Sequence, residues 1–179
     1  MITVADIQKH LPDWPAGVIE PWLIEFANDP GMGWPPPEPY GDHRWGRLLG
    51  QRPLSWWKDV TWTLEKADCG LEGLTQKAKA DVMDIRKEME SGKPSSTTKR
   101  RWDNLFRYIL NDGSFPVAPV VMRRPEGLSP IDGTHRMAVL SGLRLIPEAS
   151  FAAKRLAKPS NEQNVWMGKH KDGELPNAQ

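Results

Sequence analysis

The chain has 179 residues, of which 39% are hydrophobic and 26% charged, so it can bury a core of ordinary size as one domain with or without an extension. Its mean hydropathy of -0.58 and the lack of a long uncharged apolar run exclude a membrane-spanning helix. The 24 basic and 23 acidic residues give a formal net charge of +1, which excludes bulk charge as the main force for binding nucleic acid. The single cysteine, Cys69, and the lack of a secretory signal predict a cytoplasmic protein with no contact to a membrane.

The N-terminal third of the chain is rich in proline and tryptophan. Nine of the 17 prolines lie at or before Pro53, and seven of the nine tryptophans lie at or before Trp62. We expect residues 1–57 to form an extension that packs on the core by inserting tryptophan side chains. The stretch from Pro35 to Pro39 would be a stiff connector or a polyproline II ligand for another protein.

Apolar spacing predicts three elements in the first half of the chain. Residues 15–28 carry apolar side chains at helical spacing, and Pro21 would bend or split that helix. Residues 59–64 are β-branched and aromatic, which predicts a strand. Residues 71–89 have apolar side chains three or four positions apart, which predicts an amphipathic helix that ends at Ser91-Gly92-Lys93-Pro94.

The second half of the chain alternates between strand and helix patterns. Residues 95–98 offer several N-caps for a helix that runs to about Leu110. We then expect, in order, a strand at 117–122, a strand at 128–131, a helix at 133–141 that Gly142 ends, and a strand at 145–151. Together these elements predict a small mixed α/β domain at residues 58–155, followed by a polar C-terminal tail at 156–179.

Residues 128–143 combine a strand, a glycine turn and the start of a helix. Gly133 permits the tight turn, and we expect Thr134 to cap the helix. The amides of Thr134, His135 and Arg136 would lie in the first turn, where the helix dipole favours an anion. Arg136 adds a guanidinium suited to phosphate oxygens, and His135 adds a donor whose charge changes near neutral pH. The pattern predicts phosphate binding by these four residues, with a capped turn and a surface ion pair of Arg136 as the alternative.

The run Ile131-Asp132-Gly133-Thr134-His135-Arg136 resembles the DGxHR motif of the ParB/sulfiredoxin superfamily. The order of elements from about residue 60 to 152 is similar to that fold, which implies a small mixed sheet with flanking helices. The resemblance implies that the motif binds the phosphates of a nucleotide or another phosphorylated small molecule. Members of the superfamily include proteins that bind CTP, sulfiredoxins and a free-serine kinase. We therefore expect ATP or ADP, or CTP, with Mg²⁺ as the cofactor.

Two departures from the superfamily exclude its best-known activities. Sulfiredoxins have a reactive cysteine where this chain has Thr134, and a threonine cannot form a thiolate, so we do not expect sulfinic-acid reduction. Partition proteins follow the domain with a helix-turn-helix module, and the residues after Phe151 are too few for one, so we do not expect DNA partition.

A phosphotransferase or nucleotide hydrolase also needs a carboxylate that activates the acceptor or holds Mg²⁺. Asp132 would serve as base or metal ligand, or would accept backbone hydrogen bonds in the turn. His135 would neutralise developing charge. Glu65 and Asp68 follow the first predicted strand and resemble the early carboxylate of related kinases, and Glu72 is a weaker candidate. The predicted catalytic residues are therefore Asp132, His135 and Glu65.

The alternative function is a non-catalytic ParB-like module that binds nucleic acid or a protein partner, or a ParB-like DNase. The basic run Lys99-Arg100-Arg101, together with Arg107, would contact nucleic acid or form the solvated face of its helix. The segment Tyr40–Arg47 holds Asp42, His43 and two arginines, which would contact a substrate from a loop or form a surface turn. The four histidines lack the spacing of a zinc site.

Overall fold

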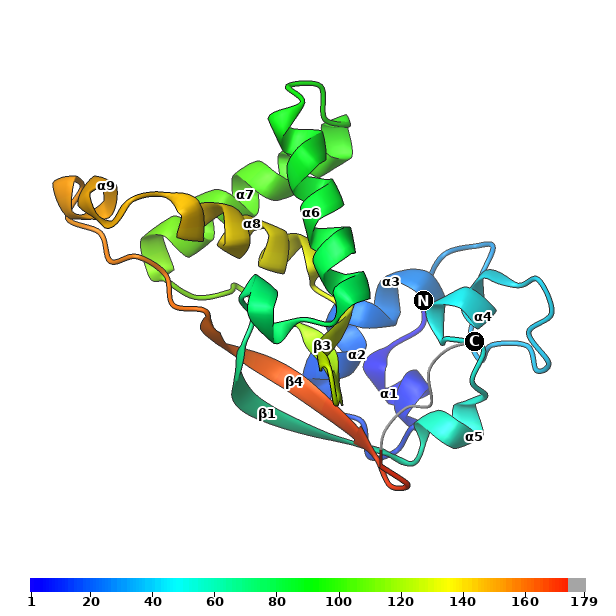
Figure 1. Ribbon diagram of the computed structural model, residues 1–179. Coiled ribbons are helices and arrows are strands. Elements are labelled where there is room, and N and C mark those ends of the chain that lie inside the picture. Colours follow the sequence, from blue (N-terminus) through cyan, green and yellow to red (C-terminus); the bar gives the residue numbers. More distant parts are fainter. Residues whose placement is uncertain (174–179) are drawn as a thin grey trace. The chain divides into compact units, whose positions relative to one another are not determined.

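The computed structural model describes residues 1–173 of the chain (Figure 1). The chain forms two compact units, one made of Met1–Thr63 with the segment that begins at Met167, and the other of Leu64–Trp166. Strands β1 (Val60–Asp68) and β4 (Glu162–His170) each contribute residues to both units. The predicted combination of helices with a small sheet, an α/β fold, is confirmed.

The first unit is built from short helices. They are α1 (Val4–Gln8), α2 (Ala16–Trp22), α3 (Ile24–Ala27), α4 (Arg44–Leu48) and α5 (Leu54–Trp57). The helix predicted at residues 15–28 is divided into α2 and α3 at Leu23, two residues after Pro21, which lies inside α2. A proline has no amide proton and its ring crowds the turn before it, yet α2 continues through Pro21 to Trp22 before the division.

Tryptophan side chains form the core of the first unit. Trp14 stacks on Trp22 with ring centroids 5.5 Å apart, and it meets Trp57 and Trp62 edge-on at 5.8 and 5.1 Å. Trp14 is 1% exposed, and its Nε1 donates a hydrogen bond to the Trp57 carbonyl oxygen at 3.1 Å. These rings pack on one another, so tryptophan side chains form a hydrophobic core within the first unit.

Within residues 1–173, four strands form one sheet in the order β1-β4-β2-β3. Strands β2 (Val120–Arg124) and β3 (Gly127–Asp132) form an antiparallel hairpin, in which Val120 lies opposite Asp132 and Arg124 lies opposite Gly127. Asp132 is the last residue of β3. It therefore lies at the end of the hairpin that is remote from the hairpin turn, directly before the next helix.

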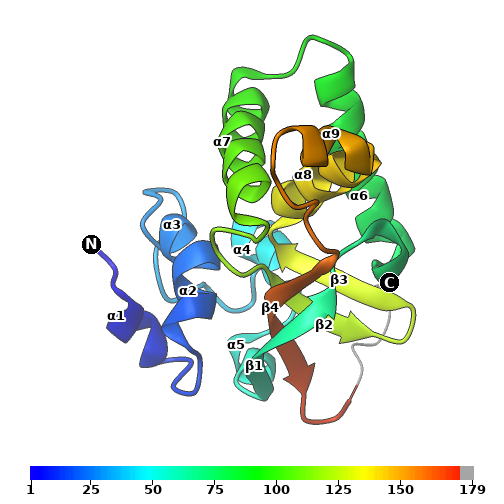
Figure 2. The same cartoon turned by 90° about the vertical axis from the view of Figure 1, so that its left-hand side faces the viewer.

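Three longer helices belong to the second unit: α6 (Gln76–Glu90), α7 (Ser96–Asp112) and α8 (Thr134–Leu145). Helix α8 packs against both α6 and α7 (Figures 1 and 2). The short 3-10 helix η1 (Leu71–Gly73) precedes α6, and helix α9 (Glu148–Ala153) follows α8. Side-chain caps define where α6 and α7 begin, since the hydroxyl oxygens of Thr75 and Ser95 accept hydrogen bonds from the amides of Ala78 and Thr98.

The structure corrects two predictions around α8. Gly142 does not end this helix, which continues to Leu145. A Cβ on Gly142 would lie 3.3 Å from the Trp102 ring of α7, so the glycine gives room for close packing of the two helices. The strand predicted at 145–151 is wrong, because these residues complete α8 and begin α9, with Pro147 as the N-cap of α9. A short apolar run does not distinguish a strand from a helix end.

The prediction of a loosely held tail at 156–179 is wrong for the residues that form β4. Gln163, Val165 and Met167 are buried along this strand. The sequence looked irregular because polar Gln163 occupies a buried position, which hides the alternation of a half-buried strand. The last six residues of the predicted tail lie outside the described part of the chain. Within the described part, no helix combines the length and apolar character that a bilayer crossing needs.

Candidate functional site

The candidate site is the turn that joins β3 to α8, made of Asp132, Gly133, Thr134, His135 and Arg136 and named here the DGTHR turn. Gly133 is the N-cap of α8, with φ 105° and ψ 10°, a left-handed conformation that glycine adopts readily. No side chain caps this helix. The amides of Thr134 and His135 therefore have no capping group, as a helix N-terminus that receives an anion requires. The Arg136 amide, also predicted to face the anion, instead donates to the Gly133 carbonyl oxygen at 2.9 Å.

Thr134 does not cap α8 as predicted. It is the first residue of the helix itself, and Gly133 takes the N-cap position. The turn requires a positive φ at the cap, and a β-branched threonine avoids that conformation. The hydroxyl of Thr134 is consequently not used to cap the first-turn amides.

The side of Gly133 where a Cβ would project is filled by two neighbours. A Cβ built there would lie 2.6 Å from Cβ of Pro119 and 2.8 Å from Nη1 of Arg136. Glycine is therefore required at this position for space as well as for its backbone conformation. The lack of a side chain allows the Arg136 guanidinium to fold back against the turn.

Arg136 forms an ion pair with Asp132, its neighbour four residues earlier. Nη2 of Arg136 donates to Oδ2 of Asp132 at 2.9 Å, and the two side chains are 14% and 28% exposed. Nη1 of the same guanidinium is buried and has no hydrogen-bond partner within residues 1–173. A buried guanidinium nitrogen without an acceptor is costly, and a ligand oxygen would satisfy it.

His135 is half-buried and faces charges from three helices. Burial, and then the positive charge of Arg101 on α7, lower the pKa of His135 below its ordinary value of 6.5, while Glu88 on α6 and Asp132 act in the opposite direction. His135 is therefore neutral near pH 7, which favours a role as hydrogen-bond donor or proton acceptor over a role as fixed cation.

Glu88 and Arg101 lie close enough to His135 to act on its charge, a proximity that the sequence did not indicate. Glu88 accepts a hydrogen bond from the Ser95 amide at 2.8 Å, which ties the end of α6 to the start of α7. This bond and the nearby hydroxyls of Thr98 and Ser95 hold the pKa of Glu88 below its ordinary value. No sequence signal connects these residues with His135, because only the packing of α6 and α7 on α8 brings them close to it.

The structure places the other predicted carboxylates outside the DGTHR turn. Glu65 on β1 accepts a hydrogen bond from Nη2 of Arg123 at 3.3 Å. In the hairpin, Arg123 lies opposite Leu128 and Val120 lies opposite Asp132. Val120 and Arg123 are three residues apart on β2, which is about 10 Å at the rise of a strand. Glu65 therefore belongs with the opposite end of the hairpin.

Asp68 and Glu72 have structural roles close to their own positions. Oδ1 of Asp68 accepts a hydrogen bond from the Gly70 amide at 2.8 Å, an arrangement typical of turns. Glu72 pairs with Lys79 on α6 at 3.3 Å. Neither contact brings a carboxylate to the DGTHR turn.

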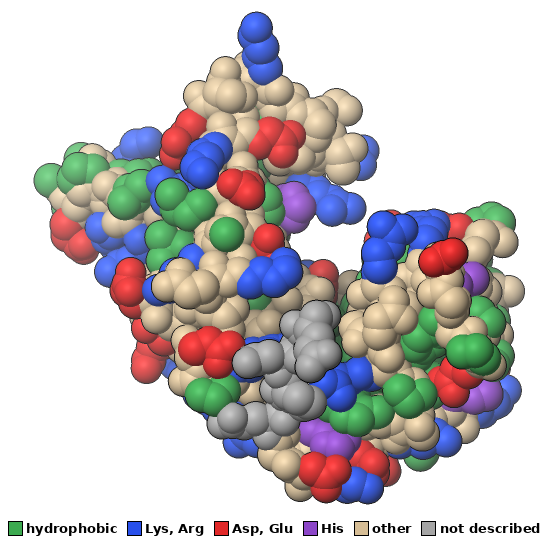
Figure 3. Space-filling view, turned by 45° about the vertical axis from the view of Figure 1, so that its right-hand side comes forward, with side chains coloured by type: hydrophobic (Ala, Val, Ile, Leu, Met, Phe, Trp, Pro, Cys, Tyr) green, Lys and Arg blue, Asp and Glu red, His purple; other side chains and the backbone are tan. Residues whose placement is uncertain are grey.

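The basic residues of α7 divide into paired and unpaired groups. Lys99 pairs with Asp103 one turn later on the same helix. Arg100, Arg101 and Arg107 are exposed, and none of them forms an ion pair within residues 1–173. On the face that Figure 3 shows, basic and acidic side chains are intermixed, in keeping with the net charge of +1.

The segment Tyr40–Arg47 forms a cap and a short helix. Nδ1 of His43 accepts the amide of Trp45 at 3.2 Å and begins α4, and Nη1 of Arg44 pairs with Oδ2 of Asp29 at 2.9 Å. The histidine is thus used structurally, and Arg44 and Arg47 lie in the same helix.

Cys69 and the histidines form no metal site in the described part of the chain. Among these residues no three His, Cys, Asp or Glu side chains lie together as metal ligands would. Cys69 is 1% exposed, and burial followed by the negative charge of Asp68 raises the pKa of its thiol to about 12. A thiol in this state is inert toward electrophiles.

Comparison with protein-family models, with curated proteins and with solved structures gave no match.

Proposed function

We propose that the chain binds a nucleotide or another phosphorylated small molecule at the DGTHR turn. The observation that carries the proposal is Nη1 of Arg136, which is buried without a hydrogen-bond partner in the described chain beside a helix start that no side chain caps. A phosphate oxygen would accept from this nitrogen and from the amides of Thr134 and His135 together. The resemblance of the turn to the DGxHR motif of the ParB/sulfiredoxin superfamily supports the same ligand.

Each residue of the turn has a defined part in this proposal. Asp132 holds Arg136 through its Oδ2 and so fixes the guanidinium before a ligand arrives. The amides of Thr134 and His135 donate to the phosphate, and the neutral imidazole of His135 donates a further hydrogen bond. Gly133 gives the backbone conformation that lets these donors converge.

The enzymatic form of the proposal is a phosphotransferase or nucleotide hydrolase that uses ATP, ADP or CTP. Mg²⁺ bound with the nucleotide would neutralise phosphate charge, held mainly by phosphate oxygens with Asp132 as the protein ligand. Asp132 must then exchange its contact with Arg136 for the metal or for an acceptor hydroxyl. Asp132 and His135 remain the proposed catalytic residues, whereas Glu65 would need a different arrangement to reach them because it pairs with Arg123.

Calorimetric titration of the whole chain with ATP, ADP and CTP, with and without Mg²⁺, tests the proposal. We expect Arg136→Gln to weaken binding at least roughly tenfold, since a charged hydrogen bond to the phosphate is removed. Arg144→Gln is the matched control, because Arg144 lies on the same helix and donates to the Pro159 carbonyl at 2.9 Å, away from the DGTHR turn. Equal affinities in the wild type and in Arg136→Gln would refute the site, provided that both unfold at similar temperatures.

A second candidate function is binding of nucleic acid by α7. Arg100, Arg101 and Arg107 are exposed cations without an acidic partner in the described chain, and Tyr108 on the same helix is 41% exposed. Arginines of this kind contact phosphates, and an exposed aromatic ring stacks on bases. This arrangement supports a nucleic-acid interface that needs no DGTHR turn.

Gel-shift titration with single-stranded and duplex DNA at several salt concentrations tests this second function. The double variant Arg100→Gln/Arg107→Gln should bind DNA more weakly. The slope of log affinity against log salt concentration should also fall by about two, because about two fewer counterions are released on binding. Lys77→Gln is the control, since Lys77 is paired with Asp81 on the exposed side of α6. Cleavage of supercoiled plasmid with Mg²⁺ in the same samples would identify the DNase alternative.

A further inference from the structure

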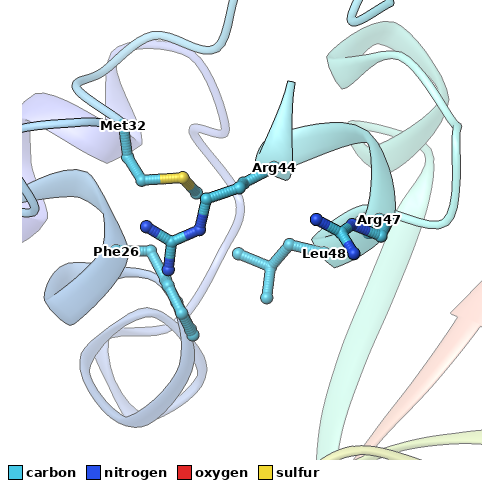
Figure 4. A pocket seen from close by; sticks show the side chains of 5 residues that line it. All are labelled: Phe26, Met32, Arg44, Arg47 and Leu48. Carbon is cyan, nitrogen blue, oxygen red and sulfur yellow. The ribbon is translucent and has the colours of Figure 1, made fainter. Parts of the chain in front are cut away.

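A pocket lies wholly within the first unit, and the DGTHR turn has no part in it. It has a volume of about 290 Å³ and is lined by Phe26, Met32, Arg44, Arg47 and Leu48 (Figure 4). Three of these side chains are apolar and two are guanidinium cations. In Figure 4 the guanidinium of Arg44 points toward Phe26, and Leu48 lies between the two arginines.

The walls of this pocket are held in place by Trp45. The Trp45 ring is fully buried, and its Nε1 donates to the carbonyl oxygens of Met32 and Gly33 at 3.3 and 3.0 Å. The same ring packs edge-on against Phe26, with centroids 6.5 Å apart. Trp45 therefore connects α3, the Met32 loop and α4, and the pocket exists before any ligand binds.

The two arginines of the pocket differ in their partners. Arg44 pairs with Asp29, whose pKa is lowered by the Gly31 amide and then by Arg44, so this carboxylate is ionised. Arg47 is exposed and has no side-chain partner within the described residues. Two cations and one anion leave a single uncompensated positive charge at the edge of an apolar cavity.

We infer that this pocket binds a small monoanion with an apolar body, of the class of aromatic monocarboxylates. A carboxylate matches the planar fork of Arg47, and it would neutralise the remaining charge without an excess. The ring would pack on Phe26 and Leu48 and contact the thioether of Met32, which binds aromatic rings well. The volume is near the lower limit of about 300 Å³ for small-molecule sites, which favours a ligand with one ring.

Benzoate is the probe for this inference, with benzamide as its neutral isostere and acetate as a carboxylate without a ring. Binding is measured on the whole chain by calorimetry and by the methyl NMR signals of Met32 and Leu48, which a bound ring would shift. We expect benzoate to bind at least roughly tenfold more tightly than benzamide or acetate. The contrast between ligands tests the pocket even without a variant.

Arg47→Met removes the charge and keeps the stem of the side chain, and it should weaken benzoate binding about tenfold. Arg107→Met is the matched control, since Arg107 is also an exposed arginine but belongs to the second unit. Arg136→Gln should bind benzoate like the wild type, which separates this inference from the proposed function. The inference is overturned if benzoate fails to bind at about 10 mM, if it binds no better than benzamide, or if Arg47→Met keeps the wild-type affinity.

Discussion

Arg136 and Asp132 are joined at 2.9 Å across one turn of chain, while the second terminal nitrogen of Arg136 is buried without a partner in the described structure. One half of the guanidinium is thus satisfied by the protein, and the other half is left for another acceptor. Asp132 consequently orients the arginine and also competes with an incoming anion for it.

Asp132→Asn should affect nucleotide binding and phosphotransfer in different ways. The substitution removes a negative charge beside the proposed phosphate position and breaks the ion pair with Arg136. We therefore expect the free energy of unfolding to fall by about 1–2 kcal/mol. Nucleotide affinity should be unchanged or higher, because Arg136 loses its competing carboxylate, while any phosphotransfer should be lost. Calorimetry and a turnover assay on the same sample measure both, and a large loss of affinity would contradict the competition between Asp132 and the anion for Arg136.

Gly133→Ala should be much more costly than the same change at an open glycine. A Cβ at residue 133 would collide with Pro119 and Arg136, and the turn requires residue 133 to keep φ near 105°, which alanine rarely adopts. We therefore expect the free energy of unfolding to fall by about 3 kcal/mol. Gly113, the C-cap of α7, has φ 71° and no atom within 4 Å of a Cβ position, so Gly113→Ala should cost only about 1 kcal/mol. Denaturant titration compares the two variants, and similar costs would contradict the steric argument.

His135 should make the stability of the chain fall at mildly acidic pH. Its pKa in the folded chain is below the ordinary 6.5, so the unfolded chain takes up the proton first as the pH falls. The free energy of unfolding should therefore decrease as the pH falls below about 6.5, and the loss should be complete below the folded pKa. Denaturant titrations of the wild type and His135→Gln between about pH 7.5 and pH 5 measure the difference, which should be absent above about pH 7.5.

Anion binding should reverse the effect on His135. A phosphate beside the imidazole favours its charged form, so nucleotide binding near pH 6 should take up protons. Calorimetry in two buffers with different ionisation heats detects this uptake, and His135→Gln should abolish it. Binding without proton uptake in the wild type would place the phosphate away from His135.

Gln163→Leu should destabilise the chain although it replaces a buried polar residue with an apolar one. Oε1 of Gln163 accepts the Phe115 amide at 3.1 Å, and Nε2 donates to the carbonyl oxygens of Gly113 and Ser160. These three backbone groups would lose their partner, at a cost of about 2–3 kcal/mol. Glu162→Leu, at the exposed neighbouring position of β4, should change stability by less than about 0.5 kcal/mol. Thermal and denaturant unfolding of both variants decides the point.

Local patterns predicted the elements that position the candidate site. The apolar spacing along α6 and the Ser95 cap of α7 are signals within one helix, and the glycine between β3 and α8 is a signal of the turn itself. Strand β4 was missed because Gln163 is buried through hydrogen bonds to distant backbone, which hydrophobicity does not indicate. Gly142 was misinterpreted as a helix end, since only the approach of Trp102 explains it.

The candidate site was predictable only as far as it is contiguous in sequence. Asp132 to Arg136 lie in one turn, so their proximity follows from the chain. Glu88 and Arg101 act on His135 from other helices, and their contribution depends on helix packing. For the same reason Glu65 could not be separated from the site before its partner Arg123 was known.

Because the thiol of Cys69 is buried, thiol-directed probes should not label the folded wild-type chain. Because Cys69 is the only thiol and has a pKa raised to about 12, a maleimide or spin label would react with a cysteine introduced at exposed Val117 or Leu145 and leave the native residue untouched. Any slow labelling of Cys69 in the wild type then requires local unfolding, so its rate measures how often the end of β1 opens.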